Sequence, residues 1–140
     1  MNNDFDLATI NATNKGTMME TLGIEYLEAG LGYVKARMPV DHRTHQPMGL
    51  LHGGATIALA ESLASIGSAL MVDLDHFHVV GQHVTANHIR SVRDGWVIGE
   101  AQTIHKGKTT HLWNIDVKDE AGHLISTCRI TIFIAKKRIQ

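Results

Sequence analysis

The sequence predicts an α+β fold in which one long helix packs against an antiparallel sheet. Residues 53–72 form a stretch of twenty residues with a single charged side chain, that of Glu61. Such a stretch is too long for a strand and indicates a helix. Two segments before it and four after it alternate apolar and polar residues, as half-buried strands do. Strands grouped on both sides of a single helix favour a helix packed on a sheet over repeated βαβ units.

The expected elements follow one another in chain order, separated by turn residues. A short helix is expected over residues 4–11 and the long helix over residues 53–72. The expected strands cover residues 22–27, 33–39, 79–92, 96–105, 109–118 and 123–134. The turns between them contain Gly30-Leu31-Gly32, Asp94-Gly95, Lys106-Gly107-Lys108 and Glu120-Ala121-Gly122. Because the long helix is almost entirely apolar, we expect it to be buried on most of its sides.

The composition indicates one globular domain that spans residues 1–140. With 44% hydrophobic and 19% charged residues, a chain of this length buries a core of its own, and no linker or repeat divides it. Lys and Arg (13) nearly balance Asp and Glu (14), which disfavours nucleic acid and anionic membranes as partners. A single cysteine, Cys128, and an N-terminal segment without a long apolar run favour a cytoplasmic protein without disulfides.

A membrane-spanning helix is the alternative for residues 53–72, since about 20 apolar residues cross a bilayer. Glu61 and three serines interrupt the stretch, and the flanking segments have the pattern of soluble strands, which disfavours this alternative. The many Gly and Ala residues instead indicate a helix that a sheet or a partner helix approaches closely. We therefore expect no membrane partner.

Glu61 is the first candidate for chemistry, because a carboxylate in an apolar helix must be paired, protonated or exposed to a cavity. At helical spacing Ser65 and Ser68 follow it on the same face, which places one carboxylate and two hydroxyls on a wall of hydrocarbon. This composition suits the wall of a pocket. The alternative is a buried glutamate that only hydrogen-bonds to hydroxyls or to a basic residue.

The second candidate is the segment from Gln46 to Gly54, QPMGLLHGG, which delivers paired glycines to the start of the long helix. A helix N-terminus exposes unpaired N–H groups, and Gly53 lets a ligand oxygen approach them. Such donors stabilise the oxyanion that forms when a thioester carbonyl is attacked, and Gln46 adds a side-chain amide. A glycine pair alone would favour an ordinary turn. The isolated carboxylate eight residues later favours the catalytic interpretation.

The stretch from Met38 to Ser62, MPVDHRTHQPMGLLHGGATIALAES, closely resembles the hotdog thioesterases of the phenylacetic-acid-pathway type. Within that family it is most similar to 1,4-dihydroxy-2-naphthoyl-CoA hydrolases of menaquinone biosynthesis and to the proofreading thioesterases of enterobactin synthesis. The resemblance runs from about residue 17 to 134 and includes the motifs VVG at 79–81 and ANHIRS at 86–91, and the strand around Trp113. It implies a hotdog fold, in which an antiparallel sheet wraps around one long central helix.

The resemblance also implies roles for particular residues. Glu61 falls on the family's nucleophile or general base, and Gly53 falls on the amide that polarises the thioester carbonyl, with His52 beside it. Gln46 matches the glutamine that helps to position the thioester, and Ser65 matches the hydroxyl one turn after the glutamate. The implied reaction is hydrolysis of an aromatic acyl-CoA, with the 1,4-dihydroxy-2-naphthoyl thioester as the candidate substrate and without a cofactor.

The CoA part of the substrate is expected to meet basic residues, because its phosphates need cations. By the resemblance, the CoA channel is lined by Gly81, His88, Ile89, Arg90, Ser91, His105, Lys106, Gly107, Lys108 and Thr109. From the residues alone, these charges favour a solvated strand face and turn over a CoA site. The resemblance further implies a homotetramer, built as a dimer of dimers, with active sites at the subunit interfaces.

Other chemistries find less support in the sequence. Of ten histidines, His76, His78 and His88 share one parity along an extended stretch, but no second cysteine or carboxylate–histidine cluster accompanies them, so we expect no metal site. No Gly-x-Ser-x-Gly motif is present, and Cys128 stands in a strand without an evident base. A hotdog dehydratase would need a histidine paired with an acid in a different Pro/Gly-rich segment. Two alternatives stay open: a proofreading thioesterase for carrier-bound aryl groups, and a non-catalytic acyl-CoA-binding module in which Glu61 is structural.

Overall fold

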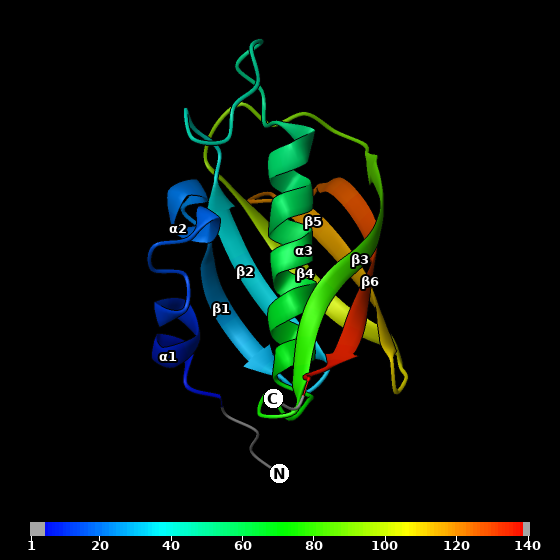
Figure 1. Cartoon of the computed structure of the whole chain (residues 1–140). Coiled ribbons are helices and arrows are strands. Elements are labelled where there is room, and N and C mark those ends of the chain that lie inside the picture. Colours follow the sequence, from blue (N-terminus) through cyan, green and yellow to red (C-terminus); the bar gives the residue numbers. More distant parts are fainter. Residues whose placement is uncertain (1–4, 139–140) are drawn as a thin grey trace.

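In the computed structural model, which describes residues 5–138, six strands form one antiparallel sheet and the longest helix lies across it (Figure 1). The helices of this part of the chain are α1 (Leu7–Ala12), α2 (Met18–Leu22) and α3 (Gly53–Ala69). Its strands are β1 (Glu25–Gly30), β2 (Tyr33–Pro39), β3 (Phe77–His88), β4 (Trp96–Lys106), β5 (Thr110–Asp119) and β6 (Leu124–Lys136). The sheet order is β1-β2-β4-β5-β6-β3, with every neighbouring pair antiparallel. The predicted α+β architecture is confirmed.

The strand that follows α3 lies at the edge of the sheet. β2 pairs with β4 rather than with β3, so α3 carries the chain across the sheet before β3 begins. β3 pairs with β6, from Phe77 opposite Lys136 to His88 opposite Ser126. Its other edge has no strand partner within residues 5–138, and its side chains are mostly exposed. An uncovered edge of this length offers unpaired N–H and C=O groups to a second chain.

The core lies between α3 and the face of the sheet that it covers, and small residues let the two approach. A β carbon added to Gly67 would collide with the ring of Trp113, and one added to Gly99 would stand 2.6 Å from Leu63. Trp113 and Leu63 are fully enclosed, and burial of such side chains is the main favourable contribution to folding. The expectation that a sheet approaches the helix closely is therefore confirmed.

Ser68 is part of this core. Its hydroxyl accepts a hydrogen bond from Nε1 of Trp113 at 2.9 Å and lies 2.8 Å from Nδ1 of His111. The expectation that Ser68 shares a pocket wall with Glu61 is wrong, because the twisted sheet covers this part of the helix face although it leaves Glu61 open.

The long helix is less enclosed than its composition predicted. Among residues 5–138, all six strands lie on one side of α3, and the short α2 packs against it from elsewhere. Ala58, Ser62 and Ser65 are therefore only partly covered, and Glu61 is exposed. The expected burial therefore holds fully only on the side that packs on the sheet, and the carboxylate of Glu61 is not buried, which contradicts the alternative of a buried glutamate. The helix also ends at Ala69, three residues before the predicted end.

The N-terminal region contains a helix that the sequence analysis missed. α2 occupies residues where a strand was expected to begin, and Gly23 ends it in the left-handed conformation with φ of +75°, so the strand starts only at Glu25. The first expected helix occurs as α1, with Asp6 as its N-cap; Asp4 lies outside the described residues. Within residues 5–138, no helix combines the length and the hydropathy that a membrane crossing requires.

Candidate active site

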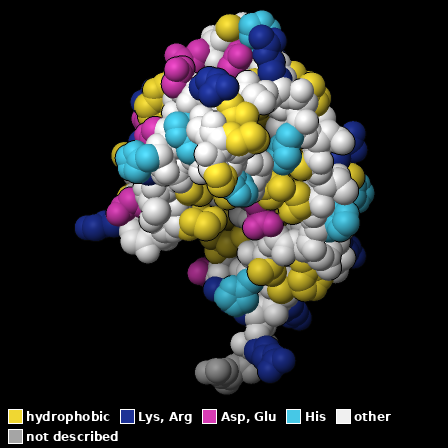
Figure 2. All heavy atoms as spheres, turned by 90° about the horizontal axis from the view of Figure 1, so that it is seen from above, with side chains coloured by type: hydrophobic (Ala, Val, Ile, Leu, Met, Phe, Trp, Pro, Cys, Tyr) yellow, Lys and Arg dark blue, Asp and Glu magenta, His cyan; other side chains and the backbone are white. Residues whose placement is uncertain are grey.

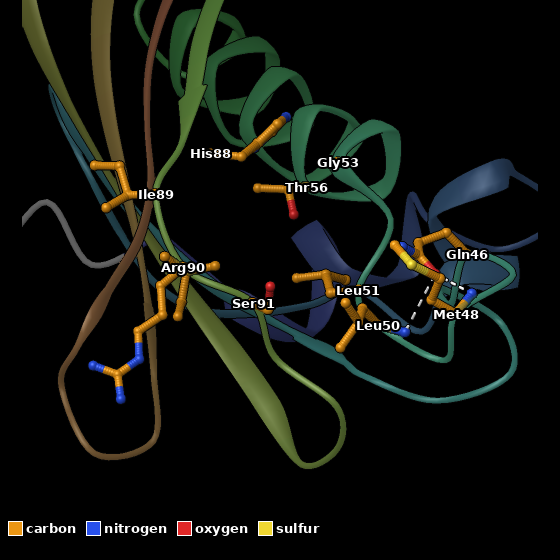
Figure 3. Close-up of a pocket in the computed structure, with 11 residues that line it drawn as sticks. Gln46, Met48, Leu50, Leu51, Gly53, Thr56, His88, Ile89, Arg90 and Ser91 are labelled. Carbon is orange, nitrogen blue, oxygen red and sulfur yellow. Dashed lines mark hydrogen bonds between the residues drawn. The ribbon is translucent and has the colours of Figure 1, made fainter.

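The N-terminus of α3 opens into a cavity of about 250 Å³ (Figure 3). The loop before the helix, its first turn, the end of β3 with the residues after it, and β6 contribute the lining residues, which are Gln46, Met48, Leu50, Leu51, Gly53, Thr56, His88, Ile89, Arg90, Ser91 and Ile125. The structure thus brings Gln46 and Gly53 together with the run 88–91, as the resemblance implied. Thr56, whose hydroxyl points into the cavity, was missed because one threonine in an apolar helix gives no signal of its own.

Gln46 is held with its amide oxygen engaged. Oε1 accepts hydrogen bonds from the backbone N–H groups of Met48 at 2.5 Å and Leu50 at 3.5 Å, both drawn in Figure 3. Gly49 completes this tight loop with φ of +76°, a conformation that glycine adopts without strain. Because the oxygen is engaged by the backbone, the Nε2 hydrogens are the part of this amide that is left for a ligand in the cavity. These are the donors that a thioester carbonyl needs.

His52 is the N-cap of α3. Its Nδ1 accepts a hydrogen bond from Gly54 N at 2.7 Å, so the imidazole satisfies one of the free N–H groups of the helix end. Its ring lines a different cavity from that of Gly53, on the side of the helix that faces Thr44 and Leu22. Within one chain, His52 therefore orders the helix start rather than sharing the cavity of Gln46.

His88 packs directly over the first residue of α3. A β carbon on Gly53 would stand 2.7 Å from Nε2 of His88, so only glycine leaves room for this ring. Nδ1 of His88 lies 3.0 Å from Oγ of Ser126, and that hydroxyl donates to the carbonyl of Asn87 at 3.1 Å. Because the serine hydrogen goes to the carbonyl, this arrangement favours the His88 tautomer with its hydrogen on Nδ1 and its Nε2 lone pair toward Gly53.

Glu61 lies in a second cavity of about 290 Å³, between α3, β3 and the N-terminal helices. Ser65 shares this cavity with it, as the resemblance implied, and Ala58, Ile66 and Val79 supply apolar walls. Gly81 was expected in the CoA channel but lies beside the carboxylate of Glu61. A carboxylate at the rim of an apolar cavity is the combination that the sequence suggested, although here it faces solvent.

Tyr26 closes this second cavity from β1 and was also missed by the sequence analysis. Its side chain is buried, and its hydroxyl donates to the backbone carbonyl of Ser62 at 3.4 Å. Burial raises the pKa of Tyr26 to about 12, so the hydroxyl stays neutral. A tyrosine in a strand pattern indicates a core residue, and the sequence alone does not distinguish that role from a cavity wall.

The residues expected to contact CoA lie in two places. Arg90 and Ser91 lie at the first cavity, with the Arg90 guanidinium pointing away from Gly53 (Figure 3). The turn from His105 to Thr109 lies at the other end of α3, where Lys106 and Lys108 line a cavity with residues that follow the helix. α3 spans about 25 Å, so one chain does not gather both groups around one ligand. Figure 2 views the N-terminal end of α3: histidines and hydrophobic side chains share this face, and Lys and Arg lie mainly toward its rim.

Gly53 and Glu61 belong to different cavities of the chain. They are eight residues apart on α3, which separates them by about 12 Å along the helix axis. A carbonyl group that is held at the helix N-terminus is therefore beyond the reach of Glu61 of the same chain, because a reacting pair must come within roughly 3.5 Å.

The cysteine and the histidines add no second centre. Cys128 is buried in β6, and burial raises the pKa of its thiol, which disfavours the nucleophilic thiolate. Among residues 5–138, no three His, Cys, Asp or Glu side chains gather in a group that could hold a metal ion.

Comparison with protein families and curated relatives gives one consistent match. Residues 48–126 match the model of the family described as the thioesterase superfamily. The proofreading thioesterase EntH of Klebsiella pneumoniae is 46% identical over 127 residues, which are 91% of this chain and 92% of that protein.

Solved structures agree with this match. A mutant of thioesterase PA1618 from Pseudomonas aeruginosa has a TM-score of 0.92 at 42% identity, covering 95% of this chain and 96% of that one. Two mutants of SAV0944 from Staphylococcus aureus, one with a glutamate and one with a glutamine changed to alanine, have TM-scores of 0.84 and 0.83 at 41% identity. They cover 86% and 84% of this chain and 99% and 98% of theirs. The hotdog fold that the resemblance implied is confirmed.

Proposed function

The chain belongs to the thioesterase superfamily, and we propose that it hydrolyses an aromatic acyl-CoA to the free acid and CoA, with Glu61 as nucleophile or general base. Membership of that superfamily makes it a thioester hydrolase. The proposal also names the acyl group of the substrate: the candidate is the 1,4-dihydroxy-2-naphthoyl group of menaquinone biosynthesis. The mainly apolar cavity beside Glu61 supports an aromatic acyl group.

The first cavity holds the thioester carbonyl in this proposal. The N–H of Gly53 and the Nε2 of Gln46 donate to the carbonyl oxygen and stabilise the negative charge that develops on it. His52 keeps the helix end ordered through its bond to Gly54. These donors are fixed by the fold before substrate arrives, which is the condition for strong electrostatic stabilisation.

The proposed mechanism depends on the separation between Gly53 and Glu61 within one chain. Since one chain holds them about 12 Å apart along the helix, a working site takes the donors from one chain and the carboxylate from a second copy. Two copies with antiparallel α3 helices would place Glu61 of each beside Gly53 of the other. The same arrangement would bring the turn with Lys106 and Lys108 toward Arg90 of the other copy and so assemble one CoA channel.

Two features of the single chain support such pairing. Glu61 is exposed, and the neighbouring strand β3 has an uncovered edge along which a second β3 can continue the sheet. In the SAV0944 mutants the changed glutamine and glutamate lie 15 residues apart, which is also the spacing of Gln46 and Glu61. We propose a tetramer, built as a dimer of such dimers.

The chemistry has two balanced routes. In one, a Glu61 oxygen attacks the thioester carbon, the carbon–sulfur bond breaks, and CoA leaves as thiolate; water then opens the acyl-glutamyl anhydride to the acid and regenerates the carboxylate. In the other, Glu61 takes a proton from the water that attacks the carbon, the resulting tetrahedral intermediate collapses as its carbon–sulfur bond breaks, and the proton on Glu61 passes to the departing thiolate or to solvent. Ser65 stands one turn from Glu61 in the same cavity, where it orients the carboxylate or the water.

A proofreading role on carrier-bound aryl groups is the alternative that a comparison favours, because EntH carries that name at 46% identity. Both substrates present the same pantetheine thioester, and the carrier replaces only the nucleotide end of CoA. Comparing kcat/KM for an aryl-CoA with that for the same aryl group on a carrier protein decides between them. A non-catalytic acyl-CoA-binding module is the further alternative, and release of thiol from an aryl-CoA separates it from an enzyme.

A subunit-complementation experiment tests the shared site. Glu61→Gln and Gln46→Ala are each expected to be nearly inactive, and the two proteins are then mixed after partial unfolding so that subunits exchange. In a shared site, half of the sites in each mixed dimer contain both native residues, so random mixing should restore about a quarter of wild-type activity. No restoration, although native mass spectrometry detects mixed oligomers, would contradict a site that two chains build.

A further inference from the structure

Most of the hydroxyl groups that line the cavity beside Glu61 face an occupant as hydrogen-bond acceptors rather than donors. Three of these hydroxyls already give their single hydrogen to backbone carbonyls; these are the hydroxyls of Thr13, Ser62 and Tyr26. A hydroxyl whose hydrogen is engaged has only lone pairs left for a ligand. Toward these three groups, an occupant therefore has to supply the hydrogens itself.

Asn14 adds an acceptor that lacks a partner. Its residue is only 6% exposed, and its Nδ2 donates to the carbonyl of Ile24 at 3.0 Å. This bond fixes the orientation of the amide, because turning it over would place two oxygens face to face. Oδ1 has no hydrogen-bond partner among residues 5–138. Buried acceptors are almost always paired, so we expect this oxygen to accept a hydrogen bond from a donor other than those of residues 5–138.

We propose that Asn14 sets acyl specificity: its Oδ1 accepts a hydrogen bond from a hydroxyl group on the acyl part of the substrate, so that hydroxylated aromatic acyl thioesters are preferred. The inference rests on the proposed function, in which the acyl group fills the cavity beside Glu61. An unsubstituted ring leaves Asn14 unpaired, and a methoxy group brings only another acceptor. A site built to hydrogen-bond a hydroxyl rejects analogues that lack it far more strongly than an apolar pocket rejects a change in size.

A ring in this cavity would reach the shielded oxygen of Asn14 by displacing the side chains next to it. Met18 and Met19 share the cavity wall with Asn14, and Met18 is 57% exposed. Methionine side chains are unbranched and change rotamer at low cost, so an entering ring moves them rather than the backbone. Asn14 itself stays fixed through Ile24, which gives the acceptor a defined position.

The test compares substrates that differ in one group. Benzoyl-CoA, its 2-, 3- and 4-hydroxy isomers and the matching methoxy compounds are assayed for kcat/KM with the wild-type protein and with Asn14→Leu. We expect the wild type to prefer at least one hydroxy isomer over both benzoyl-CoA and its methoxy counterpart by ~10-fold or more. In Asn14→Leu this preference should fall to within about 2-fold, since Leu keeps the volume and removes the acceptor.

Asn11 supplies the matched control. It stands one turn earlier and also bonds β1, but both ends of its amide are engaged with the backbone of Tyr26, at 3.0 and 2.7 Å. Asn11→Leu should therefore lower the melting temperature and leave the hydroxyl preference unchanged. Equal loss of preference in both variants would mean that general loosening, rather than the acceptor, is responsible.

Binding measurements separate failure of this inference from failure of the proposed function. The thioethers 4-hydroxyphenacyl-CoA and phenacyl-CoA cannot be hydrolysed, so calorimetry gives their Kd values with catalysis removed; the 2- and 3-hydroxy compounds complete the set. A wild-type protein that hydrolyses aryl-CoA but shows no hydroxyl preference in kcat/KM or Kd overturns the role of Asn14 alone. A protein that binds a hydroxylated thioether preferentially but hydrolyses no thioester overturns the proposed function and supports Asn14 as the selective contact.

Discussion

Gly81 of β3 lies directly against the carboxylate of Glu61 on α3. A β carbon added to Gly81 would stand 2.7 Å from Oε1 and 2.8 Å from the carboxyl carbon. The register between β3 and β6 shifts between Gly81 and His83, so the strand is irregular at the point where it meets the carboxylate. The absent side chain therefore lets Glu61 rest against the strand backbone, which defines where the carboxylate stands.

Gly81→Ala tests this contact. The added methyl group should push the Glu61 carboxylate aside and lower kcat by ~10- to 100-fold with a smaller effect on KM, because a displacement of about 1 Å is costly in a reacting geometry. Gly30→Ala is the matched control, since a β carbon there meets nothing within 4 Å. Steady-state kinetics on the two variants gives the comparison. Unchanged kcat in a folded Gly81→Ala protein would mean that the carboxylate works from another position.

Glu61→Gln should abolish most turnover without loss of stability. Removing a positioned acid–base group typically costs at least ~100-fold in kcat. The side chain is exposed, so exchange for the neutral amide should change the free energy of unfolding by no more than about 0.5 kcal/mol. Activity and melting temperature are measured on the same sample, beside the surface variant Asp75→Asn. Near-normal turnover with a large fall in melting temperature would make Glu61 a structural residue.

Arg90→Ala and Lys108→Ala should each raise KM for an aryl-CoA by ~10-fold and leave KM for the matching N-acetylcysteamine thioester within about 2-fold. Only the former substrate carries the phosphates that these cations would neutralise. Lys118→Ala, an exposed cation on β5, is the control. Equal effects on both substrates would exclude a phosphate contact for the residue concerned.

Acid should weaken the fold through His111. Its burial lowers its pKa below the ordinary 6.5, and Lys106 and His105 add to the shift. The folded protein therefore favours the neutral ring, so this contribution to stability is complete above pH 6.5 and is lost as pH falls through the lowered pKa. Replacing His111 by Gln should reduce the difference in melting temperature between pH 7.5 and 5.5. His42→Gln, with a side chain 89% exposed, should leave that difference unchanged.

The sequence predicted most of the elements and singled out Gly53 and Glu61, which each line a cavity, because both predictions depend on local patterns. A long apolar stretch interrupted by Glu61, and glycines at its start, are visible without coordinates. Helical spacing also paired Glu61 correctly with Ser65 in one cavity. It failed for Ser68. Helical spacing predicts which way a side chain points, but not which other residues it meets. At Ser68 the twisted sheet covers the helix face with His111 and Trp113.

Contacts between distant segments were beyond the reach of sequence patterns. Asn14 and Tyr26 come from the first quarter of the chain, and only folding against α3 turns them into a cavity wall. Likewise, the exposure of Glu61 follows from strands that all lie on one side of the helix. A hydropathy pattern indicates that a helix is apolar, but not which of its sides other elements cover.

The position of β3 in the sheet also orders events during synthesis. Within residues 5–138, its strand partner is β6, which follows all the other described elements in chain order, and the paired residues Phe77 and Lys136 lie far apart in the chain. The strands β1, β2, β4 and β5 can pair with one another before β6 is available, whereas β3, in the described part of the chain, pairs only with β6. Non-local pairing of this kind slows folding and leaves a strand open to association in the meantime. The wall that carries Gly81 is thus the last part of the sheet to form, and a chain truncated before β6 would leave it without a partner.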